Sequence, residues 1–341
     1  MAPPEPAASF AEIRALLPEL PGPDLESGTA AVQRQRQLTK PAGALGRLEE
    51  IAEWLATWQG RHPPQLERPR TAVFAGNHGI AAHGVSAYPQ EVTRQMVRNF
   101  IDGGGAVNQL CAEVDADLRV YELALEEPTE DFTQVAAMSE EDCARAMAYG
   151  MMVVEEGFDV MALGEMGIAN TTSAAAICCA LFGGEPRDWA GPGSGLDEEG
   201  VKRKVDVVAA GLSRHAGKLD DPLEVLRRLG GLEIAAIVGS ILACRLARTP
   251  VLLDGFACTA AAAVLYRIDP RLLDHCMAAH ISAERGHRPL LEAIGKRPLL
   301  DLDMRLGEAS GATLAISLLK AACACHVGMA TFAEAEVSRR T

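Results

Sequence analysis

The feature of this sequence that most limits its possible folds is a repeated alternation of short apolar runs with longer helical patterns. The run that ends at Ala75 and the run that ends at Leu253 are each followed within two residues by a glycine. Strands that alternate with helices indicate a mostly parallel sheet with helices on both of its faces. A chain of 341 residues can form one large domain of this kind, or a large domain and a small one.

The apolar runs and the helical periodicity together place the expected elements along the chain. Strands are expected at residues 71–75, 118–123, 160–163, 251–253 and 276–281. Longer helices are expected at residues 45–58, 89–100, 140–156, 172–181, 198–215, 232–246, 257–267 and 311–326, after a short one at 10–17. No internal repeat or heptad pattern suggests a solenoid or a coiled coil.

Composition and charge exclude some classes of partner. Hydrophobic residues make up 48% of the chain, which is enough for a sizeable core, but aromatic residues make up only 4%. The formal net charge of −14 repels polyphosphates, and few aromatic side chains are available to stack on bases, so nucleic acid is not expected as a partner. A small anionic substrate stays possible, because a local cluster of amide N–H groups can outweigh the overall charge.

The cysteines and the N-terminus indicate a cytoplasmic protein. The chain has nine cysteines, an odd number, and most lie in apolar stretches typical of buried reduced thiols. A metal site around Cys323, Cys325 and His326 is the alternative, but that spacing matches no common zinc pattern, so no metal is expected. The N-terminus lacks the pattern of a signal peptide. The longest uncharged run, 166–184, holds several polar residues and reads as a buried helix, so no membrane partner is expected.

Glycines follow several of the expected strands, and this places a candidate site. The segments 76–79, 164–167 and 254–255 each contain glycine at or just beyond a strand end. In an open α/β sheet, ligands bind beyond the carboxyl ends of the strands, where glycine lets the backbone approach a ligand closely. We expect these three turns to face one cleft, although glycine is also common in ordinary strand–helix connections.

Three glycine loops offer backbone amides to an anion. The segment 164–172 combines a strand, a glycine loop and a helix start that Asn170 or Thr171 could cap, an arrangement that suits a phosphate monoester as well as a plain helix cap. It matches neither the P-loop nor the dinucleotide fingerprint. The segment 191–197 precedes a helix that carries Lys204, and Gly230 and Gly231 open a third helix.

Two further segments could carry the chemistry. Glu308 lies between two glycines just before an Ala-rich helix. A carboxylate there can simply complement the helix dipole, but beside apolar walls its pKa would rise and it could accept a proton near neutral pH. The long loop from residue 78 to residue 96 has both hydrogen-bonding and apolar side chains, which would suit a flat aromatic base or a plain surface loop.

Seven segments, taken in order, resemble the nicotinate-nucleotide–dimethylbenzimidazole phosphoribosyltransferase family of cobalamin nucleotide-loop assembly. They are residues 39–49, 77–96, 164–172, 191–197, 230–236, 251–255 and 306–312. The resemblance implies a Rossmann-like, mostly parallel sheet with helices on both faces and a small helical domain. Residues 1–65 and 301–341 would contribute to the small domain, the latter with the catalytic loop, and residues 66–300 would form the large domain. It also implies a homodimer.

The resemblance further implies a reaction and the residues that carry it. Phosphoribose would pass from nicotinate mononucleotide to 5,6-dimethylbenzimidazole with inversion at the ribose C1′, without a cofactor or a metal. Glu308 would be the catalytic base, and Glu165 would lie near the ribose. The phosphate would be bound by Gly167, Ile168, Ala169, Asn170, Thr171, Thr172, Lys204, Gly230 and Gly231. The acceptor base would be bound by Ser86, Tyr88, Gln95, Met96 and Leu306.

The sequence departs from the family pattern at two positions, and it leaves two alternative functions open. Asn77 stands where many relatives have Asp, which would remove a charge at the mouth of the base pocket, and Ala309 stands where many have Gly, which looks harmless. Another acceptor, such as adenine, a different benzimidazole or a phenol, is the alternative within enzymes. A non-catalytic nucleotide-binding protein on the same fold is the alternative outside them.

Overall fold

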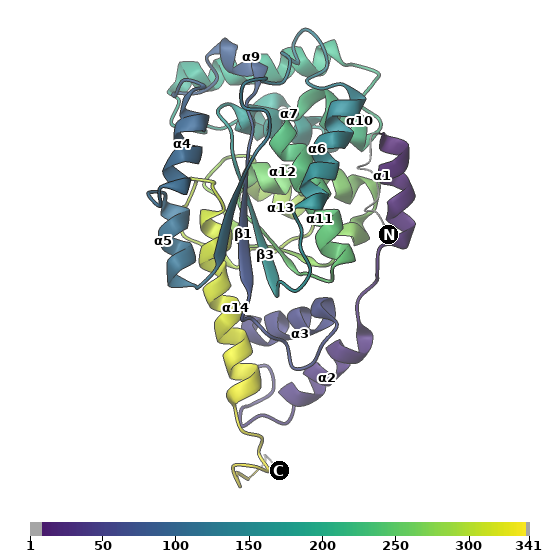
Figure 1. Cartoon of the computed structure of the whole chain (residues 1–341), viewed down its shortest axis with the longest axis vertical. Coiled ribbons are helices and arrows are strands. Elements are labelled where there is room, and N and C mark those ends of the chain that lie inside the picture. Colours follow the sequence, from purple (N-terminus) through teal and green to yellow (C-terminus); the bar gives the residue numbers. More distant parts are fainter. Residues whose placement is uncertain (1–8, 339–341) are drawn as a thin grey trace.

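The computed structural model describes residues 9–338, and its centre is a parallel sheet of five strands (Figure 1). The strand order is β2-β1-β3-β4-β5, and all neighbours are parallel. A separate pair of short parallel strands, β6 and β7, follows the fifth strand. The strand bounds are β1 Pro69–Ala75, β2 Asp117–Glu122, β3 Val160–Met166, β4 Val251–Leu253, β5 Cys276–Ala278, β6 His280–Ile281 and β7 Leu300–Asp301. The predicted α/β class is therefore confirmed.

Helices cover both faces of this sheet, as the continuous apolar strands predict. Alternate residues of a strand point to opposite faces, and in β1 Phe74 joins one apolar cluster while Val73 and Ala75 join another. The Phe74 cluster includes α6 (Glu140–Met152), α7 (Asn170–Phe182), α10 (Pro222–Leu229), α11 (Leu232–Leu246) and α12 (Phe256–Ile268). The other face carries α4 (Val92–Ile101), α5 (Ala106–Glu113) and α14 (Ser310–Gly328).

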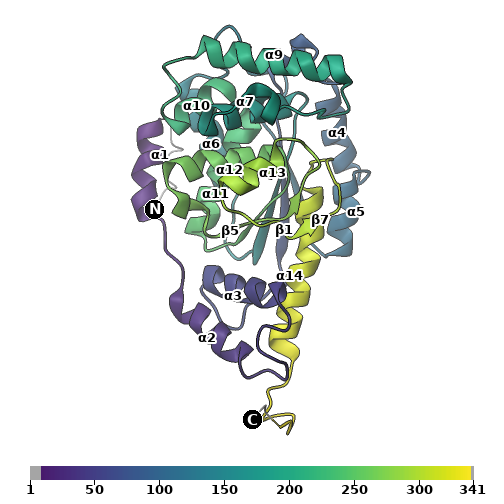
Figure 2. The same cartoon turned by 180° about the vertical axis from the view of Figure 1, so that it is seen from behind.

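The remaining helices extend this layered core at its two ends. The long helix α9 (Glu198–Arg214) lies across one end, while α2 (Leu25–Gln35) and α3 (Arg47–Gln59) lie at the opposite end (Figures 1 and 2). The second half of α14 reaches down to α3, so both chain termini contribute to a small helical unit. Short elements complete the chain: α1 Phe10–Leu16, η1 Leu17–Glu19, η2 Gly79–His83, α8 Pro186–Trp189, η3 Pro270–Leu273 and α13 His287–Ala293.

The first helix, α1, packs on the large domain, although the sequence analysis placed it in the small unit. Phe10 and Ile13 of α1 are buried in the apolar cluster of the large domain. The backbone N–H of Phe10 also donates to Glu140 Oε1 at the start of α6, at 3.1 Å. Two apolar residues three positions apart lie on one face of a helix, and here that face packs on α6.

Helix α14 is long and apolar enough to cross a membrane by length and composition alone. Half of its most apolar stretch is buried inside the protein, where it packs on α3, α5 and β3. Core helices of water-soluble proteins meet the same criterion, so this helix gives only weak support to a membrane span.

β1 and β2 begin one or two residues earlier than expected, and two larger differences have a structural reason. β3 continues through Glu165 to Met166, because it is central and pairs with β1 as far as Ala75. The run predicted as one strand at 276–281 is interrupted at Ala279, where the chain leaves β4 and pairs with β7 instead. The sequence analysis also missed α2, α5 and α10, whose short amphipathic patterns lie among polar residues.

Candidate active site

A cavity of about 730 Å³ opens beyond the carboxyl ends of the strands, where the glycine turns were expected to meet. Gly167 and Gly255 both line it, whereas Gly76 lies behind Gly167, out of the wall. The walls combine apolar and polar side chains from the segments after β1, β3, β4 and β6. The lining residues include Val85, Ser86, Tyr88, Val92, Met96, Glu165, Thr171, Gly193, Phe256, Ser282, Glu284, Arg305, Leu306 and Glu308.

The first wall of the cavity is the loop from β3 into α7. Ala169 precedes the helix with a left-handed φ of 81°, and no side chain caps the first turn. Asn170 and Thr171, the expected caps, lie inside the helix, and the Asn170 amide donates instead to Glu165. The N-terminus of α7 therefore presents amide groups that no side-chain oxygen caps, and its dipole favours an anion there.

Lys204 adds a positive charge directly behind this wall. Its side chain is fully buried, and Nζ donates to Thr171 Oγ1 at 2.6 Å and to the Gly191 carbonyl oxygen at 3.2 Å. A side-chain carbon built at Gly193 would lie 2.9 Å from Nζ, so only glycine keeps this approach open. Burial lowers the pKa of Lys204 to about 8, while the charge of Glu284 acts in the opposite direction. A phosphate dianion at α7 would strengthen the charged form of this lysine.

Glu308 reaches the cavity through an unusual left-handed turn. Gly307, Glu308 and Ala309 have φ angles of 78°, 61° and 60°, and a non-glycine residue in that region costs about 1–2 kcal/mol. Two hydrogen bonds hold the turn and the helix start after it: Glu308 N–H donates to the Glu165 carbonyl oxygen at 3.1 Å, and Ala312 N–H donates to the side chain of Asp254 at Oδ1, at 2.9 Å. Strain that the surroundings maintain in this way is typical of functional sites.

Two of the three glutamates that line the cavity, Glu308 and Glu165, have pKa values suited to proton transfer. Burial, and then the charge of Asp254, raises the pKa of Glu308 to about 7. Burial also raises the pKa of Glu165 to about 8; the Asn170 hydrogen bond opposes that rise, and the charges of Asp254, Glu233 and Glu308 add to it. Near neutral pH, Glu308 can therefore accept a proton while Glu165 is still protonated.

Four of the five residues predicted to bind the acceptor base lie in the cavity wall. Ser86, Tyr88, Met96 and Leu306 all line it. Ser86 Oγ lies 3.0 Å from Ser194 Oγ, which ties this loop to the glycine loop at 191–195. Gln95 is an exception, because its side chain is exposed outside the cavity wall. Val92 and Met96, four positions apart on α4, share the face of the helix that turns inward.

Besides Lys204, three of the predicted phosphate ligands lie behind the cavity wall. Thr172 is fully buried in the first turn of α7. Gly231 adjoins a buried hydrogen-bonded pair in which His78 Nε2 lies 2.6 Å from Glu233 Oε1, whereas Gly230 lies against Leu226. Neither glycine lines the cavity. Their direct contact with phosphate stays a prediction that this geometry does not support.

The two departures from the family pattern look different in the structure. Asn77 is buried and away from the cavity lining, and its amide donates to the Leu125 carbonyl oxygen at 2.8 Å, which a carboxylate could not do. The expectation of a lost charge at the pocket mouth is therefore wrong. Ala309 adopts the left-handed conformation that glycine prefers, so glycine in relatives has a structural reason.

Sequence reasoning missed Ser282, Glu284 and Arg305 in the cavity wall. Glu284 is 5% exposed, and neither of its carboxylate oxygens has a hydrogen-bond partner among the described residues. Ser282 and Glu284 directly follow β6, so the strand-end rule that located the other loops could have located this one.

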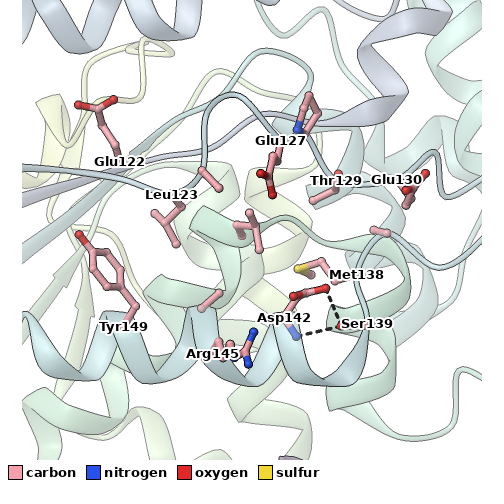
Figure 3. A pocket seen from close by; sticks show the side chains of 15 residues that line it. Glu122, Leu123, Glu127, Thr129, Glu130, Met138, Ser139, Asp142, Arg145 and Tyr149 are labelled. Carbon is pink, nitrogen blue, oxygen red and sulfur yellow. Dashed lines mark hydrogen bonds between the residues drawn. The ribbon is translucent and has the colours of Figure 1, made fainter. Parts of the chain in front are cut away.

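A second hollow of about 530 Å³ lies between α6 and the segment that follows β2 (Figure 3). Its lining is more acidic than that of the first cavity. Its walls carry the carboxylates of Glu122, Glu127, Glu130 and Asp142, and Arg145 is the one cationic side chain among the described residues that line it. An anionic substrate would be repelled there, so the cavity with the glycine loop is the better candidate for the active site.

The cysteines show no sign of a metal site. All nine are free, and all but Cys325 are buried. Among residues 9–338, no group of three or more His, Cys, Asp or Glu side chains is arranged to hold a metal ion. His326 Nε2 instead lies 3.1 Å from His62 Nε2.

The N-terminus of α7 and the carboxyl group of Glu308, whose pKa is raised to about 7, line one cavity, which suits an enzyme that acts on a substrate with a phosphate group. The family model described as phosphoribosyltransferase matches residues 20–337. The chain belongs to this phosphoribosyltransferase family.

Individual relatives narrow the comparison. The nicotinate-nucleotide–dimethylbenzimidazole phosphoribosyltransferases of Rhizobium etli and Brucella abortus are each 56% identical over 329 residues, which cover 96% of this chain and 97% of theirs. A crystal structure of the Thermus thermophilus enzyme of the same name superposes with a TM-score of 0.85 at 45% identity. That match covers 92% of this chain and 99% of the Thermus chain.

Proposed function

We propose that this chain transfers phosphoribose from nicotinate mononucleotide to 5,6-dimethylbenzimidazole, giving α-ribazole 5′-phosphate and nicotinate for the lower ligand of cobalamin. The observation that carries the proposal is the joint placement of Glu308 and the α7 glycine loop in the walls of one cavity. A phosphate bound at the loop would hold the sugar in the cavity, within reach of the carboxylate. The names of the close relatives support the same substrates.

The sugar phosphate would be held mainly by the loop before α7. Backbone amides of the loop before α7 and the buried Lys204 would bind the phosphate. Two amides of this loop already have partners, because Ile168 N–H donates to Thr93 Oγ1 and Asn170 N–H donates to the Gly167 carbonyl oxygen. Glu165, protonated near neutral pH, would donate a hydrogen bond toward the ribose, which its neighbour Asn170 helps to orient. Holding the sugar C1′ in line with the acceptor nitrogen supplies most of the rate enhancement by positioning.

The acceptor base would lie between Tyr88, Met96 and Leu306. One ring nitrogen of the base attacks C1′ as the bond from C1′ to the nicotinate nitrogen breaks, and that electron pair leaves on nicotinate. The other ring nitrogen then loses its proton to Glu308, whose raised pKa suits this transfer. Attack on the face opposite the leaving group inverts C1′, so the product is the α-nucleotide.

A direct assay tests the proposed reaction. The protein is incubated with nicotinate mononucleotide and 5,6-dimethylbenzimidazole, and free nicotinate and the new nucleotide are separated by chromatography. Equal amounts of the two products are expected. Tight binding of the mononucleotide without nicotinate release would favour a non-catalytic binding protein instead. Adenine, other benzimidazoles and phenols added in competition would identify the preferred acceptor.

We also propose that the protein acts as a cytoplasmic homodimer. Exposed apolar side chains gather near the cavity, where Tyr88, Leu302 and Leu306 are each 55% exposed. Such a patch is typical of a surface that a second subunit covers. Light scattering of the purified protein tests the dimer, and fractionation of the producing cell tests the location.

A further inference from the structure

The proposed donor substrate carries two negative groups, and the cavity must receive both. Nicotinate mononucleotide has a phosphate at one end and a carboxylate on its pyridinium ring at the other. The α7 loop and Lys204 account for the phosphate. Glu284 and Glu308 line the same cavity, and their charged forms would repel a second anion over part of its wall.

Arg305 is the only cationic side chain among the described residues that line this cavity. It lies three positions before Glu308, on the segment that leads into the left-handed turn. Its NH1 donates to the Gly193 carbonyl oxygen at 3.1 Å. This hydrogen bond places the guanidinium between the segment that carries Glu308 and the glycine loop at 191–195. That bond uses one of the five N–H donors of the group, so others remain for a ligand.

We infer that Arg305 binds the carboxylate of the nicotinate ring and thereby selects nicotinate mononucleotide over its uncharged amide counterpart. The inference rests on the function proposed above. A planar guanidinium matches a carboxylate in a two-point hydrogen-bonded pair, which a neutral carboxamide cannot form with the same strength. Arg305 is also exposed, so the ring it holds can leave toward solvent once its bond to the ribose breaks.

The test compares two donors that differ only in this group. For wild type, Arg305→Met and Arg305→Lys, kcat/KM is measured with nicotinate mononucleotide and with nicotinamide mononucleotide at saturating dimethylbenzimidazole. The ratio of the two values is expected to fall about 10- to 100-fold in Arg305→Met, which corresponds to the loss of one charge-assisted hydrogen-bonded contact. Arg305→Lys keeps the charge without the fork and should give an intermediate ratio.

Arg203→Met is the matched control, because Arg203 is an exposed arginine of α9 that does not line the cavity. It should leave the ratio unchanged. If kcat/KM falls equally with both donors in Arg305→Met, Arg305 only positions the loop through Gly193. If kcat/KM changes with neither donor, Arg305 has no role in donor choice. The donor ratio is unchanged in both cases, and either result overturns the inference. Calorimetric binding of the two mononucleotides gives the same ratio without turnover. Wild-type protein that releases no nicotinate would refute the proposed function, whereas the binding ratio tests Arg305 separately.

Discussion

Replacing Glu308 with Gln separates proton transfer from substrate positioning. The change keeps the size of the side chain and the backbone hydrogen bond from Glu308 N–H to Glu165, so the left-handed turn should persist. Burial and the charge of Asp254 raise the pKa of Glu308 to about 7, so both its protonated and its ionised forms are accessible near neutral pH. Removing a positioned base costs about 10²- to 10⁴-fold in turnover. We expect kcat to fall by that factor while the Kd of nicotinate mononucleotide changes little.

The pH dependence gives a second measurement on the same variant. In wild type, kcat should rise with pH through about 7 as Glu308 loses its proton, and Glu308→Gln should lack this rise. An acceptor methylated on one ring nitrogen, such as 1-methylbenzimidazole, has no proton to lose and should be used equally by both proteins. Glu127→Gln, a matched change in the acidic hollow, should behave as wild type. Turnover of Glu308→Gln close to wild type with dimethylbenzimidazole would remove this residue from the role of base.

Three further changes test the surroundings of the site. Glu165 keeps its proton up to about pH 8 in the folded protein but loses it near pH 4.5 in the unfolded chain, so the free energy of unfolding of the wild type should fall as the pH rises from 4.5 to 8. Urea unfolding of Glu165→Gln should show a smaller fall over the same pH range. Gly164→Ala would place a methyl group on the backbone of Ala309, and we expect a loss of about 1–3 kcal/mol in urea unfolding together with lower kcat. Burial and the charge of His62 lower the pKa of His326 to about 4, so stability should fall as the pH drops from 6.5 toward 4, and less steeply in His326→Gln by thermal melting.

Most of the fold could be predicted from the sequence, because buried parallel strands are continuous apolar runs. The positions of four strands and of α11 follow directly from such runs. The apolar run at 276–281 was predicted as one strand but forms two, because its apolar character does not reveal that β5 pairs with β4 and β6 pairs with β7. Helix α1 was misplaced for a related reason: its apolar face is visible in the sequence, but the surface that receives it is not.

The backbone loops of the site could be predicted from the sequence, but the side chains that reach the cavity from other elements could not. Glycine and strand ends indicated the α7 loop and the turn before α14. The position of Glu308 between two glycines indicated a possible proton acceptor, but its assignment as the catalytic base came from family resemblance. The phosphate role of Lys204 also came from the resemblance, since nothing in the sequence says that Lys204 reaches Thr171 from another helix. Gln95 and Met96 are adjacent in the chain, and only the orientation of α4 decides which of them faces the cavity.

The clustering of carboxyl groups beneath the cavity fits the charge that the proposed reaction develops. The charges of Asp254, Glu233 and Glu308 raise the pKa of Glu165, so holding these groups together works against folding. As the bond to nicotinate breaks, positive charge grows on the ribose C1′, and fixed carboxylates nearby stabilise that charge more than they stabilise the bound substrate. The phosphate would lie at the opposite pole, beside Lys204 and the amides of α7. Two poles of opposite sign would therefore align the mononucleotide, which explains how so acidic a protein can bind an anion and activate it at its sugar.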